Sequence, residues 1–435
     1  MSTHPDTMTS EETLAVVDFA GNPSAPATTG QRQPTAMPAS PPTTPLQLAP
    51  AKDRAGHGVA PTTYRNRLLA PEQLSAADID AWVALEERAL EPNAYQSPRF
   101  VLPALKHLDP GVRTNVVLLE RQSGGFHELV GVAVVRRCAG SRVMPLPHLE
   151  IYFSPYTCLG APLLDRDQAH EAAACLVDAV RKLAFASAGL VIRKIDGASA
   201  LLEAFNAVLS APRRSIGLVG TQRRAILVPA HAGPENLKLR LRKKVNEIER
   251  CKRRIAEQGE LEWRVHRHDL PAEAIDDFLR LEHDGWKGET GTSLRSTPAA
   301  EAFFREMASR FAIQGQALFT ELRLDGQTIA STSNMVSGRA GFAFKVGWDG
   351  RFRKYGVGIL NETELVRQAP QVCADLDYID SGSSPESFIE ELWPDSRNLV
   401  NAFIPTRAWG AASWRALDRM RAKHCHSNQP APLAD

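Results

Sequence analysis

A glycine-rich turn at residues 353–358, "RKYGVG", constrains the fold more than any other part of the sequence. It follows "AGFAFKVGW" (340–348), in which large and small residues alternate as in a strand. It precedes "ILNETELVRQAP" (359–370), whose apolar spacing predicts a helix. Two glycines free the backbone to bend, and a helix that begins there leaves its first N–H groups without intrahelical partners. The sequence therefore predicts a strand–turn–helix unit whose turn can bind a phosphate group.

The predicted elements follow one order on both sides of a Gly-Pro linker, "AHAGPEN" (230–236). Each block has helices, an antiparallel meander and then a strand–helix–strand unit. We expect two domains, at 61–231 and 236–418, which are of ordinary domain size. Their fold class is α/β (α+β), and each has a mixed, mostly antiparallel sheet flanked by helices.

Three helix ends are predicted from single residues. Ser75 is placed to cap the first helix. Gly189 closes a long helix over 167–189, and Ser384 caps a helix over 384–393. Residues 1–60 are rich in Pro, Thr, Ala and Ser and lack Trp and Tyr, so we predict that they are disordered. Residues 419–435 read as a polar tail.

Composition excludes several classes of protein. The formal charge of +1 gives no global attraction to nucleic acid or to an anionic membrane. No apolar stretch is long enough to cross a bilayer, and no export signal opens the chain, so we expect a cytoplasmic protein. The six cysteines form no CxxC pair, and "HCH" (424–426) lies in the tail, so we predict no metal site. The sequence does not indicate the oligomeric state.

The R-x-x-G-x-G pattern of the turn resembles motif A of the GNAT acyltransferase superfamily, which holds the pyrophosphate of acyl-coenzyme A. A wider resemblance is carried by the segments "EPNAYQSPRF", "GAPLLD", "GWKGETGTSL", "DGQTIA", "FKVGWD", "YIDSGSSPE" and "LWPDSRNL". Through them, residues 64–415 are similar to the CelD/BcsL-like branch of that superfamily, which is associated with cellulose biosynthesis and akin to FemAB-type tandem-GNAT transferases. Many members of that branch have Ser-Pro-Gly in place of 355–358, which moves this chain toward the ordinary GNAT pattern.

The resemblance implies tandem GNAT-like domains with one cofactor site. The first block has only Gly160 between its third strand and its long helix, so we expect a degenerate domain that shapes the acceptor groove. The second block is expected to bind acetyl-CoA or another acyl-CoA as co-substrate, without a metal. The residues expected to hold it are Arg353, Lys354, Tyr355, Gly356, Val357, Gly358 and Ile359.

Two candidate catalytic groups lie at the end of "DLDYID" (375–380), where GNAT strands separate. Asp380 could accept the proton of an acceptor amine, or it could cap the backbone of 381–383. Tyr378 could offer its hydroxyl to the leaving thiol, or it could simply pack. The sequence leaves both pairs of interpretations open.

Three further residues are candidates for acceptor binding. Strand alternation places Phe342, Phe344, Val346 and Trp348 on one face. Lys345 then faces the cleft, where it could bind an anionic acceptor and assist catalysis; a solvated lysine is the alternative. Trp286 and Lys287 lie in a glycine-rich loop that could cover a substrate, with Trp286 stacking on a sugar or anchoring the loop.

A basic helix is predicted over 237–258. Its apolar stripe should pack, while its other face carries nine Lys and Arg residues that either are solvated or meet an anionic partner.

The sequence leaves three functions open, which we rank in order of preference. The first is transfer of an acyl group, with acetyl as the preferred candidate, to an amine (or hydroxyl) of a small or sugar-like acceptor. The acceptor could be anionic, and the resemblance implies a role in exopolysaccharide or envelope biosynthesis. The second is FemAB-like transfer from aminoacyl-tRNA, and the third is an inactive binding module.

Overall fold

The computed structural model describes residues 62–209, 215–285, 288 and 290–427, with side chains as far as residue 422. The predictions of disorder for 1–60 and of substrate contact for Trp286 and Lys287 therefore concern residues outside the described part. Within that part, no helix is both long and apolar enough to cross a membrane.

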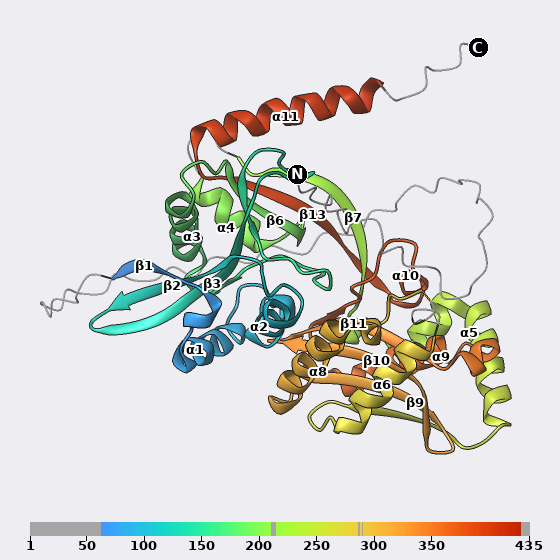
Figure 1. Cartoon of the computed structure of the whole chain (residues 1–435). Helices are drawn as coiled ribbons and strands as arrows, with labels where there is room; N and C mark the ends of the chain where they lie inside the picture. Colours follow the sequence, from blue (N-terminus) through green and yellow to red (C-terminus); the bar gives the residue numbers. More distant parts are fainter. Residues whose placement is uncertain (1–61, 210–214, 286–287, 289, 428–435) are drawn as a thin grey trace, which may run out of the picture.

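One continuous mixed sheet of 13 strands forms the frame of the molecule (Figure 1). Its order is β1-β2-β3-β4-β6-β13-β7-β12-β11-β10-β9-β8, with β5 paired to β3. Two pairs are parallel, β4 with β6 and β11 with β12, and the others are antiparallel. The strands are β1 (Thr63–Leu69), β2 (Thr114–Ser123), β3 (Phe126–Cys138), β4 (His148–Ile151), β5 (Leu163–Leu164), β6 (Gly189–Asp196), β7 (Gly217–Leu227), β8 (Leu261–His266), β9 (Ala317–Leu324), β10 (Gln327–Ser337), β11 (Ala340–Trp348), β12 (Tyr378–Asp380) and β13 (Asp395–Pro405).

The two halves of the sheet exchange their last strands. In the first half the parallel pair β4–β6 is followed by β13, which comes from the end of the chain. In the second half the parallel pair β11–β12 is followed by β7, which comes from the first half. β7 and β13 pair with each other along most of their length, which joins the two halves. The two predicted blocks are therefore linked by hydrogen bonds at the centre of one sheet.

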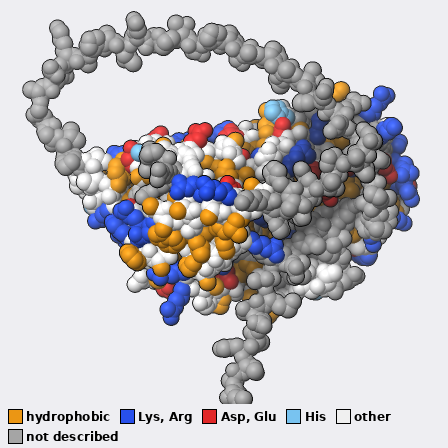
Figure 2. All heavy atoms as spheres, turned by 90° about the horizontal axis from the view of Figure 1, so that it is seen from above, with side chains coloured by type: hydrophobic (Ala, Val, Ile, Leu, Met, Phe, Trp, Pro, Cys, Tyr) orange, Lys and Arg blue, Asp and Glu red, His pale blue; other side chains and the backbone are white. Residues whose placement is uncertain are grey.

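Helices cover both faces of each half. In the second half α5 and α9 pack on one face, and α6 and α8 pack on the other. Figure 2 shows Lys and Arg side chains gathered along the right-hand edge, the side on which Figure 1 draws α5. The helices are α1 (Ala76–Glu86), α2 (Pro98–His107), α3 (Ala169–Leu183), α4 (Ala200–Val208), α5 (Pro234–Ala256), α6 (Ala272–Asp284), α8 (Pro298–Ile313), α9 (Val357–Val372), α10 (Phe388–Leu392) and α11 (Ala408–Ser427).

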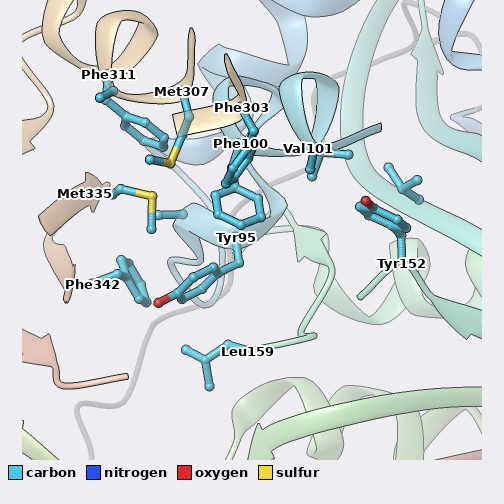
Figure 3. Close-up of a cluster of buried hydrophobic side chains, with 14 of the residues drawn as sticks. Tyr95, Phe100, Val101, Tyr152, Leu159, Phe303, Met307, Phe311, Met335 and Phe342 are labelled. Carbon is cyan, nitrogen blue, oxygen red and sulfur yellow. The ribbon is translucent and has the colours of Figure 1, made fainter. Parts of the chain in front are cut away.

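A shared aromatic core holds the halves together on the α8 side of the sheet (Figure 3). Phe100 of α2 lies edge-on to Phe303 of α8, with ring centroids 5.3 Å apart. Tyr95, in the short 3-10 turn η2 (Ala94–Gln96), contacts both Phe100 and Phe342 of β11. The first half therefore packs directly against the strand that precedes the glycine turn.

Of the three predicted helix ends, one is confirmed and two need correction. Ser75 caps α1 as predicted, since its hydroxyl accepts from the Asp78 N–H. The long helix α3 ends at Leu183, and Gly189 is instead the first residue of β6. A Cβ at Gly189 would lie 2.2 Å from the carbonyl oxygen of Ile404, so this glycine permits close approach of β13.

At the C-terminal end, α10 is capped by Ser387 and not by Ser384. The predicted tail begins as part of a helix, because α11 reaches Ser427 and is anchored by buried Ala411 and Trp414.

A buried polar layer separates two apolar clusters under α9. The Asn361 amide donates to the hydroxyls of Thr320 and Thr332, and its oxygen accepts from the Trp263 indole. The Thr332 hydroxyl donates to Oε1 of Glu362, while Oε2 of that carboxyl has no hydrogen-bond partner among the described residues. Burial raises the pKa of Glu362 to about 7.

This raised pKa predicts a stability change with pH. The unfolded carboxyl loses its proton near its ordinary pKa of 4.5, while the folded one keeps it to about 7, so stability falls as pH rises between these values. Glu362→Gln keeps the acceptor for Thr332 and removes the titration. We expect the variant to be more stable than the parent by up to about 3 kcal/mol at about pH 8, with little gain at about pH 4. Urea unfolding at both pH values measures this, and an equal difference at the two would contradict it.

Candidate functional site

The glycine turn links β11 to α9 through a short 3-10 segment, η5 (Gly350–Tyr355). Gly356 has a left-handed backbone (φ 62°, ψ 43°) and is the N-cap of α9. The space around it is open, since the nearest atom to an added Cβ is Ile359 Cδ1 at 4.0 Å. Its positive φ is therefore what favours glycine here. The Leu360 N–H is bonded to the Gly356 carbonyl at 2.9 Å, which begins the helix.

The N-terminus of α9 combines two features that favour an anion. The N–H groups of Val357, Gly358 and Ile359 precede the first intrahelical donor, and the helix dipole is positive at this end. Arg353 and Lys354 are exposed beside it. Tyr355 is buried, and Val357 packs with it in the cluster that joins α9 to α5. This donor set of N–H groups and cations fits a pyrophosphate.

β11 separates from β12 directly before the turn. The two strands pair only where Ala340–Phe342 meet Tyr378–Asp380. Beyond Phe342 the residues 343–346 are half-buried and have no partner in β12. This separation leaves a gap between β11 and β12, the two strands at which the sequence predicts the reaction site.

A β-bulge at Phe344 changes the faces that were predicted for β11. Lys345 pairs with Ser333 and Ala343 pairs with Asn334, so Phe344 is an extra residue. The predicted common face of Phe342, Phe344, Val346 and Trp348 is wrong: Phe344 packs with the α8 aromatics, whereas Trp348 packs with the α5–α9 cluster. Strand alternation could not reveal this, because a bulge shifts the period by one residue.

Lys345 lies in a contact between the halves. Its ammonium is 3.0 Å from Oε1 of Glu282 on α6 and 5.3 Å from the ring centroid of Tyr156. The Glu282 carboxyl is fully buried and also accepts from the Leu294 N–H. The Lys345 side chain is 14% exposed, so it is ion-paired and largely enclosed, not solvated.

Asp380 is fully buried between two guanidinium groups. Arg224 donates to Oδ1 at 3.0 Å, and Arg397 donates to Oδ2 at 2.5 and 3.0 Å. The Gly382 N–H donates to Oδ1 at 2.8 Å, which is the loop cap that the sequence left open. Burial alone would raise the pKa of Asp380, but Arg397 and Arg224 outweigh it and hold the pKa below its usual value. A carboxylate so bound is a weak proton acceptor, so the geometry favours the cap over the base.

Tyr378 packs beside the same charge cluster. Its ring lies under the Arg397 guanidinium, 5.1 Å from the centroid, and its hydroxyl accepts from Arg397 at 3.4 Å. Burial raises the pKa of this hydroxyl. The structure thus places Tyr378 and Asp380 together and separates them from Lys345, which lies on the α6 side of the bulge.

The first half supplies residues to the gap that sequence reasoning missed. The Tyr95 hydroxyl donates to the Ala343 carbonyl at 3.0 Å. The Cys158 thiol lies 3.6 Å from the Gly382 carbonyl, and Tyr156 stacks on Phe303. The only available signal was that Tyr95 belongs to "EPNAYQSPRF", a segment of the family resemblance. Within the described residues, no group of three or more His, Cys, Asp and Glu side chains could hold a metal ion.

The Asp380 cluster predicts a large effect on stability. Asp380→Asn removes the anion that two buried guanidinium groups share and leaves Arg397 only the Asp196 carboxylate at 3.9 Å, so we expect a loss of about 3 to 5 kcal/mol in unfolding free energy. Asp377→Asn is the matched control, because Asp377 lies three residues earlier and pairs with exposed Arg339. It should cost less than about 1 kcal/mol. Chemical denaturation measures both, and an Asp380 variant as stable as the control would contradict the cluster's structural role.

Comparison with known proteins gives one match to a family. Residues 242–388 match the model described as Acetyltransferase (GNAT) domain, and this segment contains β9 to β12 and the glycine turn. No curated protein matches the chain.

Solved structures are similar over most of the chain, at low identity. A conserved protein of unknown function from Bacteroides thetaiotaomicron VPI-5482 shares 12% identity, covers 76% of this chain and 98% of its own, and has a TM-score of 0.49. FemX shares 10%, with coverage of 78% and 98% and a TM-score of 0.48. A tandem GNAT protein from the clavulanic acid biosynthesis pathway shares 13%, with coverage of 80% and 99% and a TM-score of 0.36. The family match therefore concerns residues 242–388, and the CelD/BcsL-like branch stays a prediction.

Proposed function

We propose that this protein is an acyltransferase that moves an acyl group, acetyl foremost, from coenzyme A to an amine (or hydroxyl) of a small or sugar-like acceptor. One observation carries the proposal. A strand that leaves its parallel neighbour after Phe342 leads through left-handed Gly356 into the N-terminus of a 16-residue helix. The family match over 242–388 supports it.

The chain's own groups suggest how the co-substrate would be held. Arg353, Lys354 and the N–H groups of Val357, Gly358 and Ile359 would bind the pyrophosphate, with Tyr355 packed beneath them. Acyl-CoA, when bound, supplies the acyl group as a thioester. The half-buried backbone of 343–346 faces the gap between β11 and β12, and holding the reactants along it would lower the barrier by orientation.

Asp380, on the β12 side of the gap, would act by positioning the loop that follows β12. Asp380 holds Gly382, where an added Cβ would come within 2.7 Å of the Ala343 carbonyl oxygen. Asp380 therefore fixes the loop after β12 against β11, and the acceptor proton would pass to another group or to water. Lys345 remains our candidate to face an acceptor, because its ammonium lies on the partly exposed segment of β11 between Glu282 and Tyr156.

Transfer from aminoacyl-tRNA is the alternative, and the charges of α5 weaken it. Among the described residues, Lys244 pairs with Glu391, Lys252 with Glu364, and Arg250 with Glu247. Arg240 donates to backbone carbonyls of 391–393. Cations that are already engaged in this way are less available to a phosphate backbone. α5 also contains no aromatic residue, which disfavours stacking on bases.

The turn gives a direct test of co-substrate binding. Gly356→Val forces a β-branched residue into a left-handed backbone and should weaken coenzyme A binding at least about tenfold, measured by titration calorimetry. Gly326→Val is the matched control: its φ is 78°, nothing lies within 4 Å of an added Cβ, and it sits in the β9–β10 turn. It should lose similar stability and keep its affinity.

The same titration should include aminoacyl-tRNA. Binding of coenzyme A by the parent and the Gly326 variant, and its loss in the Gly356 variant, is the expected result. Equal affinity in all three proteins would contradict the role of the turn. Binding of tRNA but not of coenzyme A by the parent would overturn the acyl-CoA assignment.

A further inference from the structure

We propose that Arg254 of α5 forms, with the adjacent Arg253, a second phosphate subsite beside the glycine turn, which binds the 3′-phosphate on the ribose of coenzyme A. This inference rests on the proposed function and names the part of the co-substrate that the second site recognises. The cations come from the helix that precedes the sheet of the second half, outside the strand–turn–helix unit itself.

Packing brings the end of α5 to the turn. Ile248 and Ile255 of α5 are buried in one cluster with Tyr355, Val357 and Leu360. The side chain of Ile255 is fully enclosed, so the last turn of α5 is fixed against the start of α9. The neighbouring Arg253 and Arg254 are exposed on the outer side.

Arg254 meets the turn through the ring of Tyr355. Its guanidinium carbon lies 5.9 Å from the ring centroid, and the Lys354 ammonium lies 4.9 Å from the same centroid. Both cations therefore flank one buried aromatic residue that directly precedes Gly356. The attraction of a cation to an aromatic ring favours both cations at this place beside the turn.

The cations of α5 differ in whether a carboxylate neutralises them. Lys244 and Lys252 are neutralised by Glu391 and Glu364, and Lys238 lies near Glu235. For Arg253, Arg254 and Lys354, no carboxylate partner is found among the described residues. Arg351, two residues before Arg353 in the chain, is paired with Asp349. Cations without a carboxylate partner among the described residues thus lie where α5 and the turn meet, and also at Arg242 and Lys243 toward the start of α5, far from the turn.

Coenzyme A carries two separate phosphate groups, a pyrophosphate and a ribose 3′-phosphate. The N-terminus of α9 suits the first, and a guanidinium pair suits the second, because Arg binds phosphate through a planar fork of donors. The simpler explanation is that Arg253 and Arg254 stabilise the C-terminus of α5 through its dipole. That role predicts no preference between ligands that differ only in the 3′-phosphate.

The test compares coenzyme A with 3′-dephospho-coenzyme A by titration calorimetry on the full chain. The parent should bind coenzyme A about tenfold more tightly than the dephospho form. Arg254→Gln should weaken coenzyme A binding about tenfold and leave the dephospho form unchanged, so that the preference disappears. Arg254→Lys keeps the charge and should retain part of the preference.

Arg242→Gln is the matched control. Arg242 is an exposed cation of the same helix, 12 residues away or about 18 Å along its axis, and has no ion pair among the described residues. It should keep the full preference for coenzyme A.

Each other outcome contradicts either the phosphate subsite alone or the proposed function together with it. If the parent binds neither ligand, the proposed function fails together with the subsite. If it binds both equally, or if Arg254→Gln weakens both equally, only the subsite is overturned. If Arg254→Gln keeps the preference and loses affinity for tRNA, the end of α5 belongs to a nucleic-acid surface instead.

Discussion

The buried contact of Asp380 with Arg224 and Arg397 is the interaction on which the arrangement of the site depends. It joins three strands: Asp380 ends β12, Arg224 lies on β7 and Arg397 lies on β13. Charges removed from water must be paired, so these strands have one favourable arrangement at this point. The loop that starts at Asp380 is thereby held against Ala343. The β12 side of the gap is therefore fixed by ionic contacts, and the β11 side is fixed by the strand hydrogen bonds of β11.

The same cluster helps to define strand register. A one-residue slip of β13 would turn Arg397 to the opposite face of the sheet and leave Asp380 with one guanidinium. Apolar side chains on a central strand discriminate less sharply between neighbouring registers than a buried ion pair does. A buried polar contact therefore adds specificity where the hydrophobic pattern of β13 alone would tolerate other pairings.

Local patterns predicted the strand, the turn and the helix around Gly356, because each depends on residues close in sequence. The partners of Asp380 could not be found in this way: Arg397 is 17 positions away and Arg224 is 156. Tyr95 reaches Ala343 across 248 positions. The bulge at Phe344 was also invisible, because no residue type marks it, and it reversed the predicted faces from Lys345 onward. The sequence thus indicated the strand, turn and helix of the candidate site, while the residues that enclose it come from contacts between the halves.

The exchange of β7 and β13 has a consequence for how the chain emerges from the ribosome. β6 cannot form its hydrogen bonds with β13 until β13 is synthesised, about 200 residues later. Until then the first half presents an open edge at β6, with unpaired N–H and C=O groups that another chain could pair with. Closing so long a loop is slow relative to local contacts. A nascent chain that stops before Asp395 would lack β13, the strand that lies between β6 and β7 and joins the two halves of the sheet, so the N-terminal half does not mature as an autonomous unit.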